Sequence, residues 1–252
     1  MPEERRLEEQ LISQEAERRL SNQLDEAEQI DVDVQTDLFK IVQGQADGVS
    51  LSGKGLVFKE NIRVQDIKLQ TDSIAVNPLS AIFGQIELNA PVNAIARIVM
   101  TESDINQALN SELVQNYAKN YNLNVEGENV SFTMQNMQLT FPGDGKIQFQ
   151  GLTQIKEKSN TRLLGFTARF RPRTHANPII LESFDCYQGE GVNFEVVLAL
   201  MQKVKELIHL PDFTWDGTKF KILNMEIIKH NLILLLETKM RQIPHSVSEI
   251  SN

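Results

Sequence analysis

The stretch "NVSFTMQNMQLTF", Asn129 to Phe141, decides the fold. From Val130 to Met134 every second residue is apolar, which is the pattern of a strand with one buried face and one wet face. The apolar set then resumes at Met137, one residue out of phase. One extra residue in an alternating strand is typical of a β-bulge, and bulges bend and twist strands. We therefore expect long, curved antiparallel strands.

Other segments repeat or extend this pattern. The alternation in "NIRVQDIKLQT" also slips by one residue, at Gln65 and Asp66, and predicts a second bulge. Alternating residues from Ile30 to Leu38 predict another strand, and residues 232–236 are typical of a strand covered on both faces. The glycines of "GDGKIQFQG" predict a hairpin turn between two strands.

Three helical segments accompany the strands. Residues 3–28 carry apolar side chains at helical spacing among Glu, Gln and Arg, which predicts a long amphipathic helix with a narrow apolar stripe. In "TESDINQALNSELVQNYAK", Thr101 and Asp104 stand at capping-box spacing and predict the start of a second helix. Residues 192–210 are apolar almost all round in their first half. We expect that helix to be largely buried or to wall a cavity.

Length and composition restrict the class of protein. The 252 residues are 41% hydrophobic, so we expect a single β-rich domain over residues 1–241, followed by a flexible tail over residues 242–252. With 25 basic and 34 acidic side chains the formal net charge is −9, which argues against a general nucleic-acid surface. The single cysteine, Cys186, excludes an intramolecular disulfide.

Motifs for catalysis or cofactor binding are missing from the sequence. The four histidines are scattered, without an HExxH or paired CxxC motif, and no GxSxG, Walker or GxGxxG motif is present. Acidic residues on alternating strands are more simply the solvated face of a sheet than a catalytic pair. We therefore predict no catalytic residue, no metal site and no cofactor, and a protein that is not an enzyme.

The chain also lacks the signals for export or for crossing a membrane. The amino terminus "MPEERRLEEQLISQEAERRL" has no apolar core of a signal peptide, which predicts a cytoplasmic protein. The most apolar stretches, "VNFEVVLALM" and "NLILLLE", fall short of the ~20 apolar residues that span a bilayer. We expect at most a peripheral, transient contact with a membrane surface.

One basic cluster departs from the acidic background. In "ARFRPRTHANP", Arg169, Arg171 and Arg173 stand two residues apart on an extended segment, so they project to one side. Guanidinium groups match phosphate oxygens, which makes the cluster a candidate for phosphate binding. The alternative is a strand whose outward face is simply basic.

The loop "NPLSAIFG", residues 77–84, is unusually apolar for a connection that begins with Pro and ends with Gly. In one interpretation Leu79, Ile82 and Phe83 form an apolar lip that dips into a bilayer or lines an entrance. In the other, the loop folds back and Phe83 fills a gap under the sheet. The sequence leaves both open.

The loop "NPLSAIFG", the helix start "TESDINQALNS" and the curved strands together make the chain resemble the LmeA-type phospholipid-binding family, most closely its cyanobacterial members. The resemblance covers residues 7–239. It implies an α+β fold of tubular lipid-binding type, in which a strongly curved antiparallel sheet wraps around a long helix. Such a fold leaves an apolar channel for acyl chains.

Two functions follow as hypotheses. The first is a non-enzymatic lipid-binding or lipid-transfer protein whose partner is a phospholipid or another amphiphile, with its headgroup near the arginine cluster. Its acyl chains would lie among six apolar residues: Phe132, Met134, Phe166, Phe170, Val197 and Met201. The alternative is an interaction or scaffold protein with a solid core, which docks through its amphipathic N-terminal helix. The same six residues then form an ordinary packed core.

Overall fold

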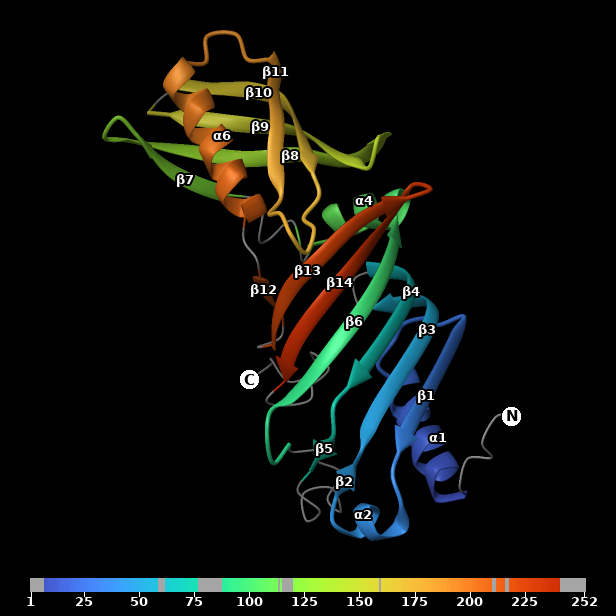
Figure 1. Cartoon of the computed structure of the whole chain (residues 1–252). Helices are drawn as coiled ribbons and strands as arrows, with labels where there is room; N and C mark the ends of the chain where they lie inside the picture. The colour runs from blue at the N-terminus through green and yellow to red at the C-terminus, as the bar shows by residue number, and fades with distance from the viewer. Residues whose placement is uncertain are drawn as a thin grey trace.

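Two antiparallel sheets arranged end to end give the molecule its elongated shape (Figure 1). The chain was analysed in a computed structural model, which describes residues 7–58, 62–76, 88–112, 114, 120–158, 160–209, 212–215 and 218–240. Both sheets are open, and helices pack beside them, so the predicted α+β class with antiparallel sheets is confirmed.

The larger sheet has seven strands, and all of its neighbouring strands are antiparallel. In spatial order they are β1 (Gln29–Gln35), β3 (Gly48–Phe58), β4 (Ile62–Thr71), β6 (Val92–Thr101), β14 (Asn231–Met240), β13 (Thr218–Ile228) and β12 (Asp212–Trp215). A short ladder of β2 (Gln45–Ala46) and β5 (Ile74–Ala75) lies at its far end (Figure 1). The sheet thus joins strands from both ends of the chain.

The smaller sheet has five strands in the order β11 (Ile180–Gln188), β10 (Asn160–Arg171), β9 (Lys146–Glu157), β8 (Glu128–Gly143) and β7 (Asn120–Val125). Consecutive strands are neighbours, as hairpins require. The predicted turn between β8 and β9 is confirmed: Gly143 pairs with Lys146, and Asp144 and Gly145 adopt positive φ angles between them.

Of the two predicted bulges, one is confirmed and one is wrong. The pairing of β8 with β9 shifts register between Met134 and Asn136, where the sequence slips out of phase. In β4 the apolar phase changes at the predicted place, but the pairing with β3 keeps its register. The pairing skips Gly55 and Gln65 together, so each strand has one unpaired residue and neither has an extra one. Gly55 sits there at φ +56°, a conformation that favours glycine.

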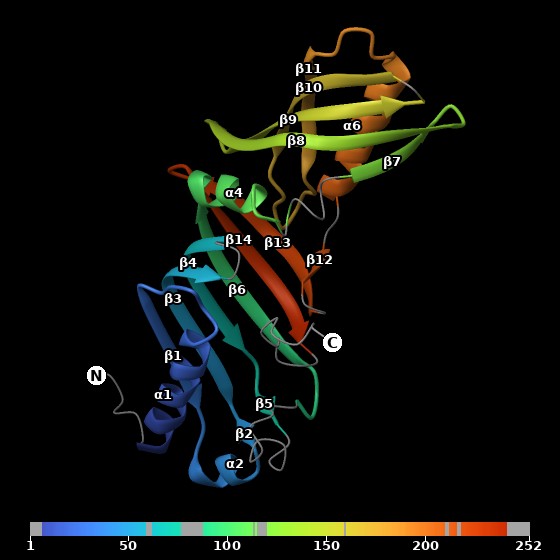
Figure 2. The ribbon, with the colours of Figure 1, turned by 180° about the vertical axis from the view of Figure 1, so that it is seen from behind.

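Helix α1 (Leu7–Ser21) lies along the outer edge of β1, and Figure 2 shows it in front of the strands. The buried Ser13 hydroxyl accepts the N–H of Val34 at 3.1 Å, and the Glu17 carboxylate accepts that of Val32 at 2.9 Å. These two contacts satisfy backbone donors that an edge strand otherwise leaves open.

The predicted lengths of this helix and of the first strand both need correction. The helix was predicted over residues 3–28 but ends at Ser21, because the backbone of Asp25 and Glu26 hydrogen-bonds to Val57 on β3 instead. The strand predicted to reach Leu38 ends at Gln35. Asp37 then caps a short helix, α2 (Leu38–Val42).

Helix α4 (Glu102–Leu109) joins the larger sheet to the smaller one and confirms the predicted capping box. The Thr101 hydroxyl accepts the N–H of Asp104 at 3.1 Å, and the Asp104 carboxylate accepts the N–H of Thr101 at 3.0 Å. From Leu113 on, the predicted helix lies largely outside the described residues.

Helix α6 (Phe194–His209) crosses the face of the smaller sheet (Figures 1 and 2). Only Val196 and Leu200 are fully buried on it, while Phe194 is 72% exposed. Of the two arrangements predicted for this helix, the largely buried one is therefore wrong, whereas the other is confirmed, because Val197 lines a cavity. Its apolar first half forms one broad face that packs on the sheet and leaves Phe194 and Leu198 exposed at its margin.

The largest hydrophobic cluster takes side chains from both sheets and from α4 and α6. A smaller cluster around Leu56, Val64 and Ile67 lies within the larger sheet. Among the described residues, no helix is long and apolar enough to cross a membrane. The single domain over residues 1–241 stays a prediction, and the tail from 242 lies outside the described residues.

Candidate functional site

Aromatic side chains between α6 and the smaller sheet form the centre of the large cluster. Phe132 on β8 and Phe166 on β10 are among the most completely buried large side chains. The Phe166 ring stacks on Phe184 of β11 at a centroid distance of 5.1 Å and tilts against Phe149 of β9 at 6.0 Å. Phe170 is buried in the same cluster. Three of the six residues predicted to contact acyl chains thus belong to one aromatic core.

Two of the other three predicted residues border this core. Met134 and Val197 are partly buried and pack against the aromatic cluster, and Met201 is half-buried one turn beyond Val197 on α6. The fold therefore gathers five of the six residues into one cluster from β8, β10 and α6. The channel itself stays a prediction.

A cavity of about 900 Å³ opens at one end of this core. It lies where β10 begins, β11 ends and α6 starts, and Val197 is the predicted channel residue that lines it. Its lining residues are Thr161, Arg162, Leu163, Leu164, Cys186, Tyr187, Gln188, Gly189, Glu190 and Val197. Because the buried Leu164 also belongs to the aromatic core, the cavity and the core share a wall.

Arg162 supplies a positive charge to the cavity, and the sequence analysis missed it. Its Nη1 donates to the carbonyl oxygen of Gly191, and it lies 3.5 Å from the Glu157 carboxylate. A guanidinium carries five N–H donors, more than these contacts use. The sequence contains a clue to this role. Arg162 stands two residues before Leu164 and four before Phe166, so on strand β10 it lies on the same face as these buried residues, where a charged residue is unexpected.

The three arginines of the predicted headgroup cluster lie elsewhere. Arg169 and Arg171 are exposed and alternate with buried residues, so they occupy the face of β10 opposite the aromatic core. Arg169 donates to the Gln148 side chain at 3.1 Å, and Arg171 lies 2.5 Å from Glu182. Arg173 is half-buried, with its guanidinium 3.4 Å from the backbone oxygen of His209.

The carboxyl group of Glu182, which pairs with Arg171, has a lowered pKa. Glu182 bonds to both Lys146 and Arg171, and these bonds, the one to Lys146 foremost, lower the pKa of its carboxyl. At neutral pH, Arg171 therefore faces a charged carboxylate on the neighbouring strand. The role of the cluster in headgroup binding stays a prediction.

The sequence matches one known protein family. Residues 4–237 match the model of the LmeA-like phospholipid-binding family. The chain belongs to this family. No curated protein matches the chain, and no solved structure matches it.

The description of the LmeA-like family names binding and no reaction, which agrees with the absence of catalytic motifs in the sequence. Within the described segments, no three His, Cys, Asp or Glu side chains are grouped closely enough to hold a metal ion. Burial, together with the charge of Asp185, raises the pKa of the Cys186 thiol in the cavity. Cys186 is therefore a protonated thiol and a weak nucleophile at neutral pH.

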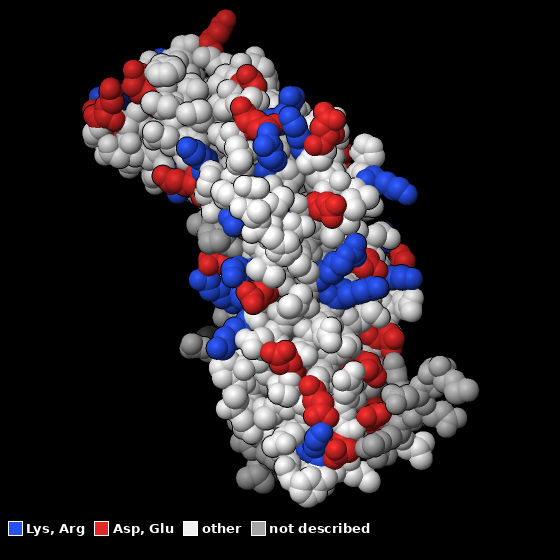
Figure 3. Space-filling view, in the orientation of Figure 1, with Lys and Arg blue, Asp and Glu red and all other residues white. Residues whose placement is uncertain are grey.

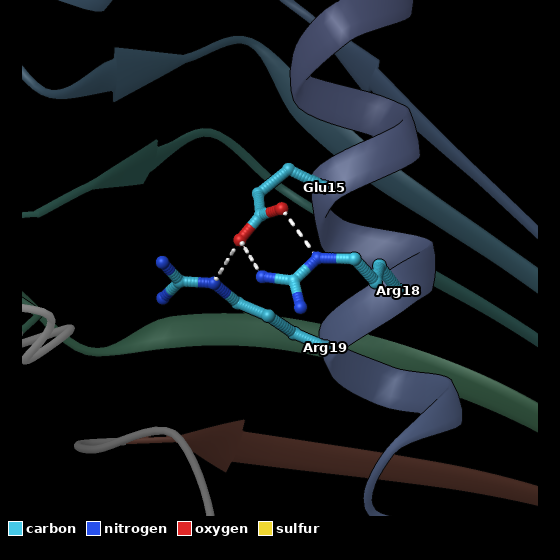
Figure 4. A network of polar contacts seen from close by, with 3 residues as sticks. All are labelled: Glu15, Arg18 and Arg19. Carbon is cyan, nitrogen blue, oxygen red and sulfur yellow. Dashed lines mark hydrogen bonds and ion pairs between the residues drawn. The ribbon is translucent and has the colours of Figure 1, made fainter.

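A strongly lowered pKa is found on α1, away from the cavity, at the carboxyl group of Glu15. The Glu15 carboxylate accepts hydrogen bonds from Arg18 at 2.8 Å and from Arg19 at 2.7 Å (Figure 4), and these bonds lower its pKa to about 2. All three side chains are solvent-accessible. These three side chains hydrogen-bond to one another on an exposed face of α1. They do not converge on a cavity where a ligand could bind.

The predicted lip of this LmeA-like chain, Leu79, Ile82 and Phe83, lies outside the described residues. On either side of it, Val76 and Leu88 form an antiparallel bridge. Over the visible face of the molecule, acidic and basic side chains are interspersed with uncharged surface (Figure 3).

Proposed function

We propose that this protein is a non-enzymatic phospholipid carrier that holds the acyl chains of its ligand beside α6 and releases them at a membrane surface. In this proposal the smaller sheet and α6 act as the lipid-holding half of a tubular lipid-binding fold. The observation that carries the proposal is the cavity of about 900 Å³ that shares a wall with the aromatic core, in a chain of a phospholipid-binding family.

The size and lining of the cavity support this proposal. Small-molecule sites have volumes of roughly 300–1,000 Å³ and combine apolar walls with a few polar groups. Here Leu163, Leu164 and Val197 supply apolar surface, and Arg162 supplies the cation. Acyl chains would lie along Leu164 and Val197, at the edge of the tightly packed aromatic core.

Arg162 is the better-placed partner for a lipid phosphate. It lines the cavity, whereas Arg169 and Arg171 lie on the opposite face of β10. The variants Arg162→Gln and Arg169→Gln remove the same charge from the same strand. If only Arg162→Gln loses bound phospholipid, the result supports a headgroup site in the cavity. If only Arg169→Gln loses it, the result supports a headgroup site at the predicted arginine cluster instead.

The proposal is tested by mass spectrometry of organic extracts from the purified protein, before and after incubation with liposomes. We expect stoichiometric phospholipid in the wild type. Val197→Trp should fill the cavity and reduce the lipid content, whereas Val42→Trp, on the exposed surface of α2, serves as the matched control. No lipid in the wild type, with none taken up from liposomes, would overturn the proposal.

One observation favours the scaffold alternative as a second candidate. Leu7 and Leu11 on α1 are 75% and 69% exposed, so the apolar stripe of that helix is only partly covered. Such a stripe suits pairing with another helix. Light scattering that shows a lipid-free oligomer, dissociated by Leu11→Glu, would support the scaffold and contradict the carrier.

A further inference from the structure

The hydroxyl group of Thr153 on β9 is buried without a hydrogen-bond partner. The residue is 0% exposed, and its Oγ1 is unpaired within the part of the chain that the structure describes. Other buried threonines are paired: the hydroxyl of Thr238 donates to the carbonyl oxygen of Lys219 at 2.8 Å, and that of Thr36 donates to the carbonyl oxygen of Gln45 at 2.9 Å. A buried polar group without a partner costs free energy, so the Thr153 hydroxyl needs an explanation.

Thr153 lies on the core face of the smaller sheet, directly behind one wall of the cavity. It pairs with Leu164 on β10 and with Met134 on β8. Leu164 is part of the aromatic core and also lines the cavity. The Cβ atoms of two residues that pair directly on one face of a sheet lie about 5 Å apart. The Leu164 side chain therefore separates the hydroxyl from the cavity.

A trapped water molecule is a poor partner for this hydroxyl. A buried water needs about two to four polar partners. The paired neighbours of Thr153, Leu164 and Met134, have apolar side chains, and the β9 backbone pairs with β8 on one side and β10 on the other. A ligand that brings its own acceptor into these apolar surroundings is a better partner.

The position of Arg162 indicates which ligand atom comes near Thr153. Arg162, the proposed partner of the lipid phosphate, stands two residues before Leu164 on the same face of β10. Because Arg162 pairs with Ile155, Thr153 is its diagonal neighbour, about 7–8 Å away. In a diacyl phospholipid the ester carbonyls follow the phosphate along the glycerol and precede the acyl chains. They are the next acceptors inward from Arg162.

Resting on the proposed function, we infer that the Thr153 hydroxyl donates a hydrogen bond to an ester carbonyl of the bound phospholipid once the Leu164 side chain turns to another rotamer. The unpaired hydroxyl destabilises the lipid-free protein and is satisfied in the complex. A site that hydrogen-bonds one group of its ligand rejects an analogue without that group, because the buried polar atom then stays unpaired. The protein should therefore select ester-linked over ether-linked lipids.

Competition between two lipids tests this selection. The protein is incubated with liposomes that contain equal amounts of dioleoyl phosphatidylcholine and its diether analogue, and its organic extract is analysed by mass spectrometry. We expect the wild type to take up the ester lipid in about three- to tenfold preference, the value of one hydrogen bond. Thr153→Val, which has the same shape without the hydroxyl, should take up both lipids equally. Thr153→Ser should keep the preference.

Urea unfolding of the protein, after its lipid has been removed on a hydrophobic resin, gives a second readout. Thr153→Val should raise the urea midpoint, because it removes an unpaired buried hydroxyl. Thr238→Val is the matched control in the larger sheet, since Thr238 is 3% exposed and its hydroxyl is paired. This variant should lower the midpoint and leave the lipid preference unchanged.

The outcomes separate this inference from the proposed function. A wild type that takes up both lipids equally, or a Thr153→Val variant that keeps the preference, overturns the role of the hydroxyl and leaves the carrier in place. A lowered midpoint in Thr153→Val also overturns it, because the hydroxyl then has a partner in the lipid-free protein, such as a trapped water. A wild type that takes up neither lipid overturns the carrier itself and the inference with it.

Discussion

Replacing Gly151 by alanine should show how tightly the aromatic core is packed. Gly151 on β9 pairs with Phe166 on β10, and a Cβ at this position would lie 2.7 Å from the Phe166 ring and 2.9 Å from the Met134 methyl group. Ordinary contact begins near 3.4 Å, so the ring must retreat by about 0.7 Å. Phe166 is only 1% exposed and stacks on Phe184, which leaves the ring little room to retreat.

The magnitude follows from two opposing effects. Overpacking of a dense core costs about 1–3 kcal/mol, and removing a glycine from a strand returns about 0.5–1 kcal/mol. We expect Gly151→Ala to lower the free energy of unfolding by about 1–2 kcal/mol. Gly165→Ala is the matched control on β10. Its Cβ would lie 2.4 Å from the Tyr187 ring, but that ring is half exposed and can swing outward. We expect its effect to stay within about 1 kcal/mol.

Urea unfolding, followed by circular dichroism, measures both variants. Equal destabilisation by Gly165→Ala and Gly151→Ala would contradict tight packing around Phe166. A Gly151→Ala variant as stable as the wild type would also refute tight packing. Phe166 would then have empty space behind it, as an open acyl-chain channel would provide.

Three further predictions concern local features. Thr101→Ala removes the hydroxyl that accepts the N–H of Asp104, while the backbone N–H of residue 101 can still donate to the Asp104 carboxylate. The variant should lower the free energy of unfolding by about 1 kcal/mol, measured by urea titration; an unchanged midpoint would contradict the role of the cap. Because the folded pKa of Glu15 is lowered from 4.5 to about 2, its charge stabilises the fold above about pH 4.5, and this contribution is lost as the pH falls toward 2. Glu15→Gln should therefore flatten the acid side of a plot of urea midpoint against pH, and an unchanged slope would speak against the network with Arg18. Since burial raises the pKa of the Cys186 thiol, iodoacetamide should alkylate it more slowly at neutral pH than it alkylates glutathione, and an equal or faster rate would count against this assignment.

Features that depend on neighbouring residues were predictable from the sequence. The bulge at Met134 to Asn136, the hairpin turn at Asp144 and Gly145, and the capping box at Thr101 all formed as predicted. Each is stabilised by contacts within a few residues or by the conformations that the local residue types allow. The family was recognised for a similar reason, since its motifs are short and contiguous.

Features that depend on distant partners were not predictable. Helix α1 ends at Ser21 because Asp25 and Glu26 find backbone partners on β3. Strand β4 keeps its register because Gly55, on the neighbouring strand, is skipped together with Gln65. In both places the local pattern allowed two outcomes, and a residue on another strand selected one.

For the candidate site, the sequence by itself determined which side chains are apolar and which face of each strand is buried, because alternation alone sets those properties. It thereby selected Phe132, Phe166 and Phe170 for the core. The tertiary structure decided that Arg162 lines a cavity and that Arg169 points to the opposite face. It also decided that Phe194 stays at the surface. Residue type sets what a side chain can bind, but only packing between separate elements fixes what lies within its reach.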